Sequence, residues 1–310
     1  MEKLIELAKS VLNHNLFLKK DERILIVTDE NLVEIANIFF RAGLELGNEA
    51  LIMQMAATSR SGEEPPSTVA EVMKLVDVVL CITKNSLSHT KARKEASASG
   101  TRIATMPGIT LDMLHEGAIT ADYSEVEELT DYYVGLLDAG SIVEIKKADS
   151  YLTFSIERRK GIRSTGVFRK KGESGNLPSG ESYIAPIENS ANGSILIDGS
   201  IAGIGVLNEP IILTIENGRL IDASGCDGKR LLELLGDGNG RVIAEFGIGT
   251  NKSARLTGNV LEDEKVFGTV HIAFGSNKSF GGSNEAGVHI DCVIKDPSVW
   301  IDKKQLNLQK

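Results

Sequence analysis

The sequence predicts an α/β fold in two parts, a doubly wound and mostly parallel sheet domain followed by a β-rich α+β domain. Short apolar runs alternate with helical stretches over residues 1–140, whereas residues 141–310 are mostly strand-like. The first span holds 8 of the 31 glycines and the second holds 23. Because glycine permits turns, bulges and close backbone approach, its crowding indicates a β-rich second half. We therefore expect domains at 1–140 and 141–310, with a boundary near 138–145.

In the first half, four short apolar runs have the length and composition of buried strands, at 24–28, 50–55, 76–83 and 101–106. Helical spacing is found between and after them, at 31–46, 67–75, 89–98, 110–117 and 124–137. Ser124 followed by Glu127 has the pattern of a capping box for the last helix. This alternation of strands and helices predicts a largely parallel sheet covered on both faces.

In the second half, residues 142–148 and 151–157 alternate with the two-residue period of half-buried strands. Two β runs, PIILTIE and RLIDAS, meet at Asn217-Gly218, a pair that favours a type I′ hairpin. A short helix is expected over 227–235, and the glycines of GDGNG end it. Three further strands are predicted from RVIAEFGI, GTVHIAF and GVHIDCVI.

The composition excludes several classes of protein. Lys and Arg total 34 against 43 Asp and Glu, a net charge of -9 that argues against nucleic-acid binding. The three cysteines, Cys81, Cys226 and Cys292, are too few and too far apart for a disulfide framework, which fits a reducing compartment. No segment has the apolar length of a signal peptide core or a membrane span. We expect a cytoplasmic protein acting on a peptide or a small molecule, with no nucleic-acid or membrane partner.

Common catalytic motifs are missing from the sequence. Gly228-Lys229 is followed by Arg230 and lacks the upstream glycine of a phosphate-binding loop. His115-Glu116 begins like a zinc-protease motif, but Ile119 stands where the second histidine would be. GDGNG lacks the flanking strand and helix of a dinucleotide fingerprint, and nothing indicates a Ser–His–Asp triad.

A set of potential metal ligands remains in the last 130 residues. His289 and Asp291 lie two residues apart in an apolar run, so their side chains leave the same face of a strand. His271 and Glu245 lie in two other apolar runs, and Glu181 follows the turn-forming NLPSG. This mixture of nitrogen and oxygen donors suits Zn, Mn, Co or Fe(II). Because adjacent carboxylates repel each other, two divalent ions are plausible.

Each of these residues also has an ordinary structural interpretation. A lone histidine in an apolar strand is more often a hydrogen-bonded core residue than a ligand. Glu245 could face solvent or pair with a base, and Asp291 could pair with a lysine or arginine across the sheet. The five residues together favour a metal site, without indicating what it does.

Four segments, in order, carry a resemblance to a known family: NLPSGESYIAP, AEFGIGTN, TGNVLEDEKVFGTVHIAFG and HIDCVI. They resemble the thermophilic metallopeptidases of the aminopeptidase T and aminopeptidase S family, and LTFSIERR at 152–159 also matches the stretch before the first glutamate motif. The first half resembles that family only through its α/β pattern and MPGIT at 106–110.

The resemblance implies a bilobed, homodimeric leucyl-type aminopeptidase with two divalent ions, Zn, Co or Mn. The implied ligands are Glu181, Glu245, His271, His289 and Asp291, with Glu181 as the preferred catalytic base. Such ions lower the pKa of bound water to about 7 and polarise the scissile carbonyl. The expected reaction is therefore release of N-terminal residues from peptides.

The chain departs from this family at two points. It is shorter between His271 and His289, and Lys278 stands where the peptidases tend to carry a tyrosine. The same architecture is shared with dihydroxypyridine ring-cleaving dioxygenases, which hold one Fe(II). In that alternative His271, His289 and Asp291 would hold the iron, and the two glutamates would be substrate contacts or structural acids. A third alternative is a noncatalytic, metal-stabilised protein that binds a ligand with the loop 275–284.

Overall fold

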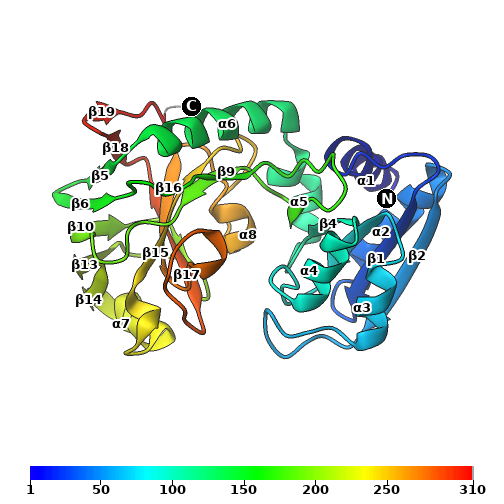
Figure 1. Ribbon diagram of the computed structural model, residues 1–310, viewed down its shortest axis with the longest axis horizontal. Helices are drawn as coiled ribbons and strands as arrows, with labels where there is room; N and C mark the ends of the chain where they lie inside the picture. The colour runs from blue at the N-terminus through cyan, green and yellow to red at the C-terminus, as the bar shows by residue number, and fades with distance from the viewer. Residues whose placement is uncertain (309–310) are drawn as a thin grey trace. The chain divides into compact units, whose positions relative to one another are not determined.

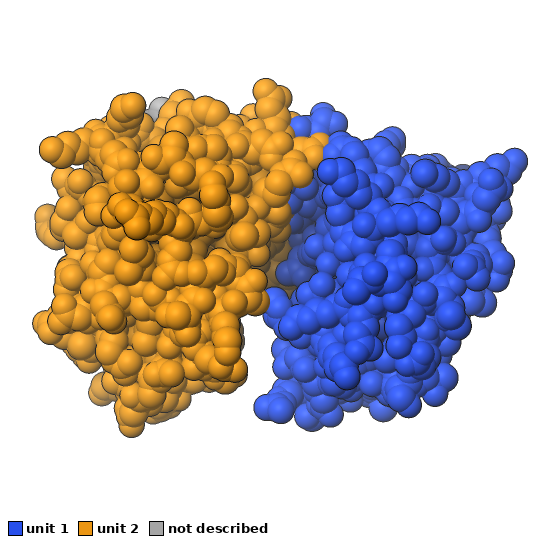
Figure 2. Space-filling model, in the orientation of Figure 1, with its two compact units in different colours: residues 1–124, 165–179 blue, residues 125–164, 180–310 orange. Residues whose placement is uncertain are grey.

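The computed structural model describes residues 1–308 and divides them into two compact units, coloured separately in Figure 2. The first unit comprises residues 1–124 and 165–179, and the second comprises 125–164 and 180–310. This division differs from a single cut near residue 140, because the segment 165–179 returns to the first unit and adds a strand to its sheet. Among the described residues, no helix combines the length and the apolar character needed to cross a bilayer.

The first unit is an α/β layer structure around a five-stranded parallel sheet, sheet A, with the order β2-β1-β3-β4-β8 (Figure 1). Its strands are β1 (Arg23–Asp29), β2 (Glu49–Met55), β3 (Val78–Ile82), β4 (Arg102–Thr105) and β8 (Ser174–Asn176). Its helices are α1 (Glu2–Ser10), α2 (Val33–Glu45), α3 (Ser67–Met73), α4 (Lys91–Ala98) and α5 (Leu111–His115). The predicted parallel sheet and its alternation with helices are confirmed.

The core of this unit follows the alternation of side chains along the strands. Leu25, Val79 and Ile103 point to the face covered by α3 and α4, where they pack with Met73 and Ala96. The intervening residues of the same strands are also buried, because α2 packs against β1 and β2 and α1 packs against α2. Strands buried on both faces explain why the sequence shows uninterrupted apolar runs here.

The second unit contains two seven-stranded sheets, with orders β14-β13-β10-β6-β5-β18-β19 in sheet B and β12-β11-β17-β16-β15-β9-β7 in sheet C. Sheet B consists of β5 (Ile142–Lys147), β6 (Ser150–Ser155), β10 (Asn192–Ile197), β13 (Ile211–Glu216), β14 (Arg219–Ala223), β18 (Ser298–Ile301) and β19 (Lys304–Gln305). Sheet C consists of β7 (Ile162–Ser164), β9 (Glu181–Ile184), β11 (Ser200–Ile201), β12 (Gly205–Val206), β15 (Ile243–Gly249), β16 (Thr269–Gly275) and β17 (His289–Lys295). The β-rich second half is therefore confirmed.

Helices are few in the second unit. They are α7 (Gly225–Leu235), α8 (Val260–Asp263) and most of α6 (Tyr123–Ala139). The backbone N–H of Ser124 donates to Asp122 Oδ1, so Ser124 lies inside the first turn of α6 rather than capping it. The remaining helical turns of the chain are a π turn at Val11–Asn15 and 3₁₀ turns at Ala118–Thr120, Asn239–Arg241 and Lys278–Phe280.

Sheets B and C share one hydrophobic core. Val143 and Phe154 of sheet B and Phe246 and Ile272 of sheet C belong to it, and the rings of Phe154 and Phe246 lie 5.4 Å apart. Asn217 and Gly218 both have positive φ in the β13–β14 turn, as the type I′ pattern predicts. Because one face of sheet C is committed to this core, its polar side chains must leave by the other face.

Candidate metal centre

Four neighbouring antiparallel strands, β9, β15, β16 and β17, bring the predicted ligands together on one face of sheet C. The pairing places Gly249 opposite Glu181, Gly247 opposite His271, and Ala273 between Glu245 and Asp291. The two-residue period then sends all five ligand side chains to the same side. We call this side the ligand face; it consists of Glu181, Tyr183, Glu245, Gly247, Gly249, His271, Ala273, Gly275, His289 and Asp291.

Small residues occupy the positions between the ligands. A Cβ atom on Gly247 would lie 2.0 Å from His271 Nε2, so only glycine leaves room for that imidazole. A Cβ on Gly275 would lie 2.1 Å from the Val288 carbonyl oxygen, and Gly275 has φ +121°. Three of the glycines of the second half, Gly247, Gly249 and Gly275, thus lie on the ligand face, and Gly247 makes room for the imidazole of His271.

The ligand atoms form two overlapping groups that share Glu245. In the first group, His271 Nε2 lies 3.3 Å from Glu245 Oε1 and 3.5 Å from Glu181 Oε2. In the second, His289 Nε2 lies 3.4 Å from Glu245 Oε2 and 3.5 Å from Asp291 Oδ1. Each oxygen of Glu245 therefore faces a different histidine.

These separations fit shared metal coordination better than direct ion pairing. Charge-assisted hydrogen bonds between nitrogen and oxygen are typically about 2.7–2.9 Å long, shorter than the four contacts just described. Ligands bound at about 2.0–2.2 Å to one tetrahedral ion are roughly 3.3–3.6 Å apart. Glu181 and Asp291 are only 6% and 7% exposed, and Glu181 Oε2 and Asp291 Oδ1 are buried without a hydrogen-bond partner. Buried, unpaired carboxylate oxygens are what a bound cation would satisfy.

The second histidine is oriented by the backbone. Its Nδ1 lies 2.8 Å from the Ser276 carbonyl oxygen, an acceptor that fixes the proton on Nδ1. Nε2 lies toward Glu245 and Asp291, so loss of its proton would direct its lone pair at both carboxylates. Metal-binding histidines are commonly held in this way by a second partner.

The electrostatics of the ligand face show strong mutual stabilisation of charge. Burial opposes the charged imidazole of His271, but its hydrogen bond to Glu245 and the charge of Glu181 raise its pKa to about 9. Burial likewise opposes ionisation of Asp291, but His289 and His271 lower its pKa to about 2. The pKa of Glu245 is lowered as well, because hydrogen bonds from both histidines outweigh its burial. A divalent ion can replace the two imidazolium protons with no change in net charge.

Two further titratable residues, Lys265 and Glu264, adjoin the five, and no sequence motif indicates them. Lys265 is fully buried, and its Nζ lies 2.7 Å from Glu181 Oε1 and also pairs with Glu264. Glu264 forms a third potential ligand group with His271 and Asp291, and burial among other carboxylates raises its pKa to about 8. The run EDEK that contains both residues has the composition of a solvated charged turn. Only its position just before the strand that carries His271 could have indicated that Glu264 and Lys265 adjoin the site.

An aromatic wall borders the ligand face. The ring of Phe280 contacts Tyr183 at 5.4 Å and His289 at 5.8 Å, both edge to face. Tyr183 follows Glu181 by two residues, so its place on this face could have been predicted from the strand period. Lys278, by contrast, is 63% exposed and pairs with Glu285, so its ammonium group forms a surface ion pair.

The glycine-rich loop between the two histidines is held by a polar network. Glu188 accepts hydrogen bonds from the backbone of Ser283 and from the side chain of Asn277, and it pairs with Arg159. Asn277 is fully buried and accepts the backbone N–H of Asn284. This network fixes the segment that carries Phe280 beside His289.

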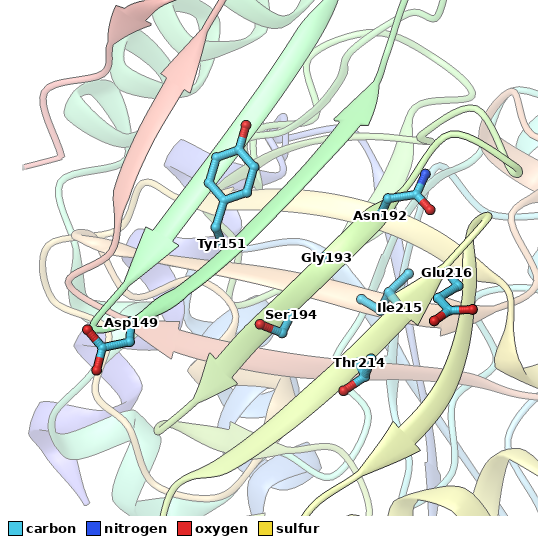
Figure 3. A pocket seen from close by; sticks show the side chains of 8 residues that line it. All are labelled: Asp149, Tyr151, Asn192, Gly193, Ser194, Thr214, Ile215 and Glu216. Carbon is cyan, nitrogen blue, oxygen red and sulfur yellow. The ribbon is translucent and has the colours of Figure 1, made fainter.

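A separate open depression lies on sheet B, and Figure 3 shows its lining side chains. It contains none of the five predicted ligands, and nothing in it matches the convergent buried donors of the ligand face. Its lining residues are Asp149, Tyr151, Asn192, Gly193, Ser194, Thr214, Ile215 and Glu216. We therefore place the candidate site on sheet C.

Two solved structures are among those with a similar fold. The 2,5-dihydroxypyridine dioxygenase from Pseudomonas putida KT2440 has a TM-score of 0.85 at 17% identity, over 98% of this chain and 95% of that one. Wild-type AmpT from Thermus thermophilus has a TM-score of 0.74 at 18% identity, over 100% of this chain and 98% of that one. Both support the predicted two-part α/β architecture.

Sequence comparison supplies the family. A search of curated proteins finds no significant match. The family model described as NicX, 2,5-dihydroxypyridine 5,6-dioxygenase, matches residues 3–308, nearly the whole length of the chain. The chain therefore belongs to the 2,5-dihydroxypyridine 5,6-dioxygenase (NicX) family.

Proposed function

We propose that this protein is a metal-dependent hydrolase of the aminopeptidase type, which holds two divalent ions on the ligand face. The observation that carries the proposal is the position of Glu245, whose two oxygens lie 3.3 Å and 3.4 Å from different histidines. In a site for a single ion, Glu245 would instead be a substrate contact or a structural acid. The fold similarity to AmpT supports the same proposal.

In this proposal the side chains divide into two binding groups. Glu181 and His271 would hold one ion, His289 and Asp291 would hold the other, and Glu245 would serve both. When bound, such ions supply a nucleophilic water near neutral pH and polarise the scissile carbonyl. These donors do not select among Zn, Co and Mn, because imidazole and carboxylate bind all three ions.

The role of Glu181 as catalytic base stays a prediction. Oε1 of Glu181 pairs with Lys265 Nζ at 2.7 Å, and Oε2 of Glu181 faces His271. Both oxygens of Glu181 therefore already have a partner in the site. The aromatic wall of Tyr183 and Phe280 would contact an apolar side chain of the substrate. We therefore expect a preference for peptides with a large apolar first residue.

The test is an assay of protein loaded separately with Zn²⁺, Mn²⁺ or Co²⁺, using leucine-initiated peptides and the same peptides with a blocked amino group. The proposal expects release of free leucine from the unblocked peptides only, loss of activity with a chelator, and recovery when the ion is restored. Glu245→Gln should remove this activity while the protein stays folded. Failure of every loaded form to release the first residue would refute the proposal.

A second function is favoured by two observations, the family match and the ammonium of Lys265 beside Glu181. The positive charge of Lys265 beside Glu181 can take the place of the charge of a second metal ion. His271, His289 and Asp291 would then hold one Fe(II), and the protein would be a ring-cleaving dioxygenase. Oxygen uptake by the iron-loaded protein with 2,5-dihydroxypyridine, at one iron per chain, would establish this alternative. A chain that binds no metal even after reconstitution would exclude both enzymes.

The homodimer implied by the family resemblance is also a proposal. Sedimentation velocity at micromolar concentration tests it directly, with a single species of twice the chain mass as the expected result.

A further inference from the structure

Strand β2 forms one edge of sheet A, and its outer side is open (Figure 1). On its inner side it pairs with β1 in an unbroken parallel register over all seven residues, from Glu49 to Met55. On its outer side, within the described residues 1–308, no strand or loop forms a backbone hydrogen bond with it. Because backbone groups alternate in direction along a strand, about half of those in β2 point outward without a partner strand.

The other five sheet edges of the described structure are protected, and β2 differs from each of them. The edge strands β7, β8, β12 and β19 consist of only two or three residues. Strand β14 is longer, but the N–H of Ile243 donates to the Gly218 carbonyl oxygen beside it, and Arg219 forms a β-bridge with Val242. Short strands, bulges, lysine and proline are common means of preventing an edge from pairing. The seven residues of β2 include no bulge, no lysine and no proline.

Apolar side chains accompany the open edge. Residues 50–53 are all apolar, and none of them is fully buried; Leu51 is 42% exposed. Helix α2 packs on β2 where a Cβ on Gly43 would lie 3.3 Å from the Ala50 Cβ, and the next residue, Leu44, is 50% exposed. The edge therefore presents both unpaired backbone groups and apolar surface.

Another extended strand satisfies such an edge, and a second copy of β2 fits it at the centre. In an antiparallel pair with Ile52 on the two-fold axis, Ile52 lies opposite its own counterpart, and Leu51 lies opposite Met53 of the partner subunit. The strand carries one charge, Glu49, at its end. Antiparallel pairing keeps the two glutamates about 20 Å apart along the strands, whereas parallel pairing would set these like charges side by side. Charge and side-chain order therefore select the antiparallel arrangement.

We propose that a second copy of this chain binds at β2, so that two β2 strands pair antiparallel and join the two five-stranded sheets into one. A two-fold contact of this kind closes after two copies and leaves no open β2 edge. It satisfies the outward backbone groups and removes Leu51 from water. The inference rests on the proposed homodimer and assigns a surface to it. It does not rest on the proposed reaction, because β2 carries none of the five predicted ligands.

Sedimentation velocity of the full chain over a range of protein concentrations tests the contact. The wild-type protein should dimerise, and Leu51→Lys should raise the dimer dissociation constant at least about tenfold, because pairing would bury two ammonium groups without partners. Leu51 is exposed in the single chain, so the variant should fold, which circular dichroism checks. Leu75→Lys is the matched control: Leu75 is 64% exposed, follows α3 and lies outside β2, so its substitution should leave the constant unchanged.

Hydrogen exchange of the wild-type protein provides an arm that needs no variant to fold. At high protein concentration the outward amides of β2 should exchange slowly, because the second strand accepts their hydrogen bonds. On dilution below the dissociation constant they should exchange rapidly, whereas the amides of the central strand β1 should stay protected at both concentrations.

Three results would overturn the inference: a wild-type monomer at all concentrations, a dimer whose dissociation constant Leu51→Lys leaves unchanged, or β2 amides that exchange equally fast at both concentrations. A monomer would remove the proposed homodimer as well, whereas a dimer insensitive to Leu51→Lys would keep the homodimer and place its contact elsewhere. Peptide hydrolysis and oxygen uptake are measured separately, so their outcome does not affect these results.

Discussion

Polar side chains gather in two places in this molecule, and they are satisfied in different ways. At the carboxyl edge of sheet A, the hydroxyls of Ser88 and Thr105 lie 2.7 Å apart, and each also lies within hydrogen-bond distance of Asn176 Oδ1. Asp29 nearby accepts backbone N–H groups of Asn31 and Lys84. On the ligand face of sheet C, in contrast, Glu181 Oε2 and Asp291 Oδ1 have no hydrogen-bond partner.

The difference separates structural polarity from binding polarity. The carboxyl edge of a parallel sheet is the usual place for ligands in α/β folds, but here the polar atoms named above are paired with one another. The ligand face keeps buried acceptors pointed at a common space, at a cost in stability that a bound cation would offset. The expectations that follow test this contrast, from the largest effect to the smallest.

His289→Ala should have the largest effect, because it removes a nitrogen donor whose Nε2 lies between Glu245 and Asp291. Loss of a residue that only orients a metal ligand typically lowers metal affinity about 10–100-fold. Loss of the ligand itself should therefore lower it by more than about 100-fold and abolish metal-dependent release of an N-terminal residue. His14→Ala is the matched control, because the side chain of His14 is exposed and lies far along the chain from the ligand strands, on the π turn Val11–Asn15. Unchanged turnover in His289→Ala would remove this residue from the site.

Gly247→Ala should disturb the site without unfolding the protein. The added Cβ would lie 2.0 Å from His271 Nε2, so the imidazole must move away from Glu245. We expect metal affinity to fall by about 10–100-fold, the range seen when ligand orientation is lost. Gly135→Ala is the control, since its Cβ in helix α6 would meet nothing within 4 Å. Equal metal affinity in the two variants would show that glycine at 247 is not needed to make room for the imidazole of His271.

Metal affinity should rise with pH. In the metal-free protein the pKa of His271 is raised to about 9 and that of His289 is also raised, so at pH 7 each imidazole carries a proton that an ion must displace. The affinity should therefore fall as the pH is lowered, about tenfold per pH unit for each displaced proton, and for His271 this fall begins below its pKa of about 9. Calorimetry in two buffers of different ionisation enthalpy measures the protons released. Release of no proton at pH 7 would show that the histidines are not ligands.

Phe280→Ala should affect the substrate more than the fold. The ring is only half-buried and contacts Tyr183 and His289, so its removal should raise KM for peptides with a large apolar first residue by about tenfold, the effect of losing one such contact. Peptides that begin with alanine should change little. An equal effect on both kinds of peptide would show that the aromatic wall does not select substrates.

Thr105→Val should have the smallest effect and none on metal binding. It removes a hydroxyl that contacts only Ser88, Asn176 and the Gly175 carbonyl oxygen within sheet A. The free energy of unfolding should fall by about 1 kcal/mol, the usual net value of such a hydrogen bond. A change in metal affinity after this substitution would mean that the sheet A edge is part of the site.

Much of this architecture could be predicted from local pattern. The two-residue period of GTVHIAF and GVHIDCVI sufficed to place His271, His289 and Asp291 on strands, and the structure brings them to one face. Strand β8 could not be predicted, because three residues, SGN, carry no periodicity and pair with a strand about 70 positions earlier. Lys265 escaped prediction for a related reason, since its burial depends on the contact that Gly249 permits between distant segments.

The direct test of the account is a crystal structure of the protein saturated with Mn²⁺ or Zn²⁺, with anomalous data at the metal edge. The account predicts two ions on the ligand face, one beside Glu181 and His271 and one beside His289 and Asp291, with Glu245 contacting both. A single ion held by His271, His289 and Asp291, with Glu245 free of it, would contradict the two-ion hydrolase and support the iron dioxygenase.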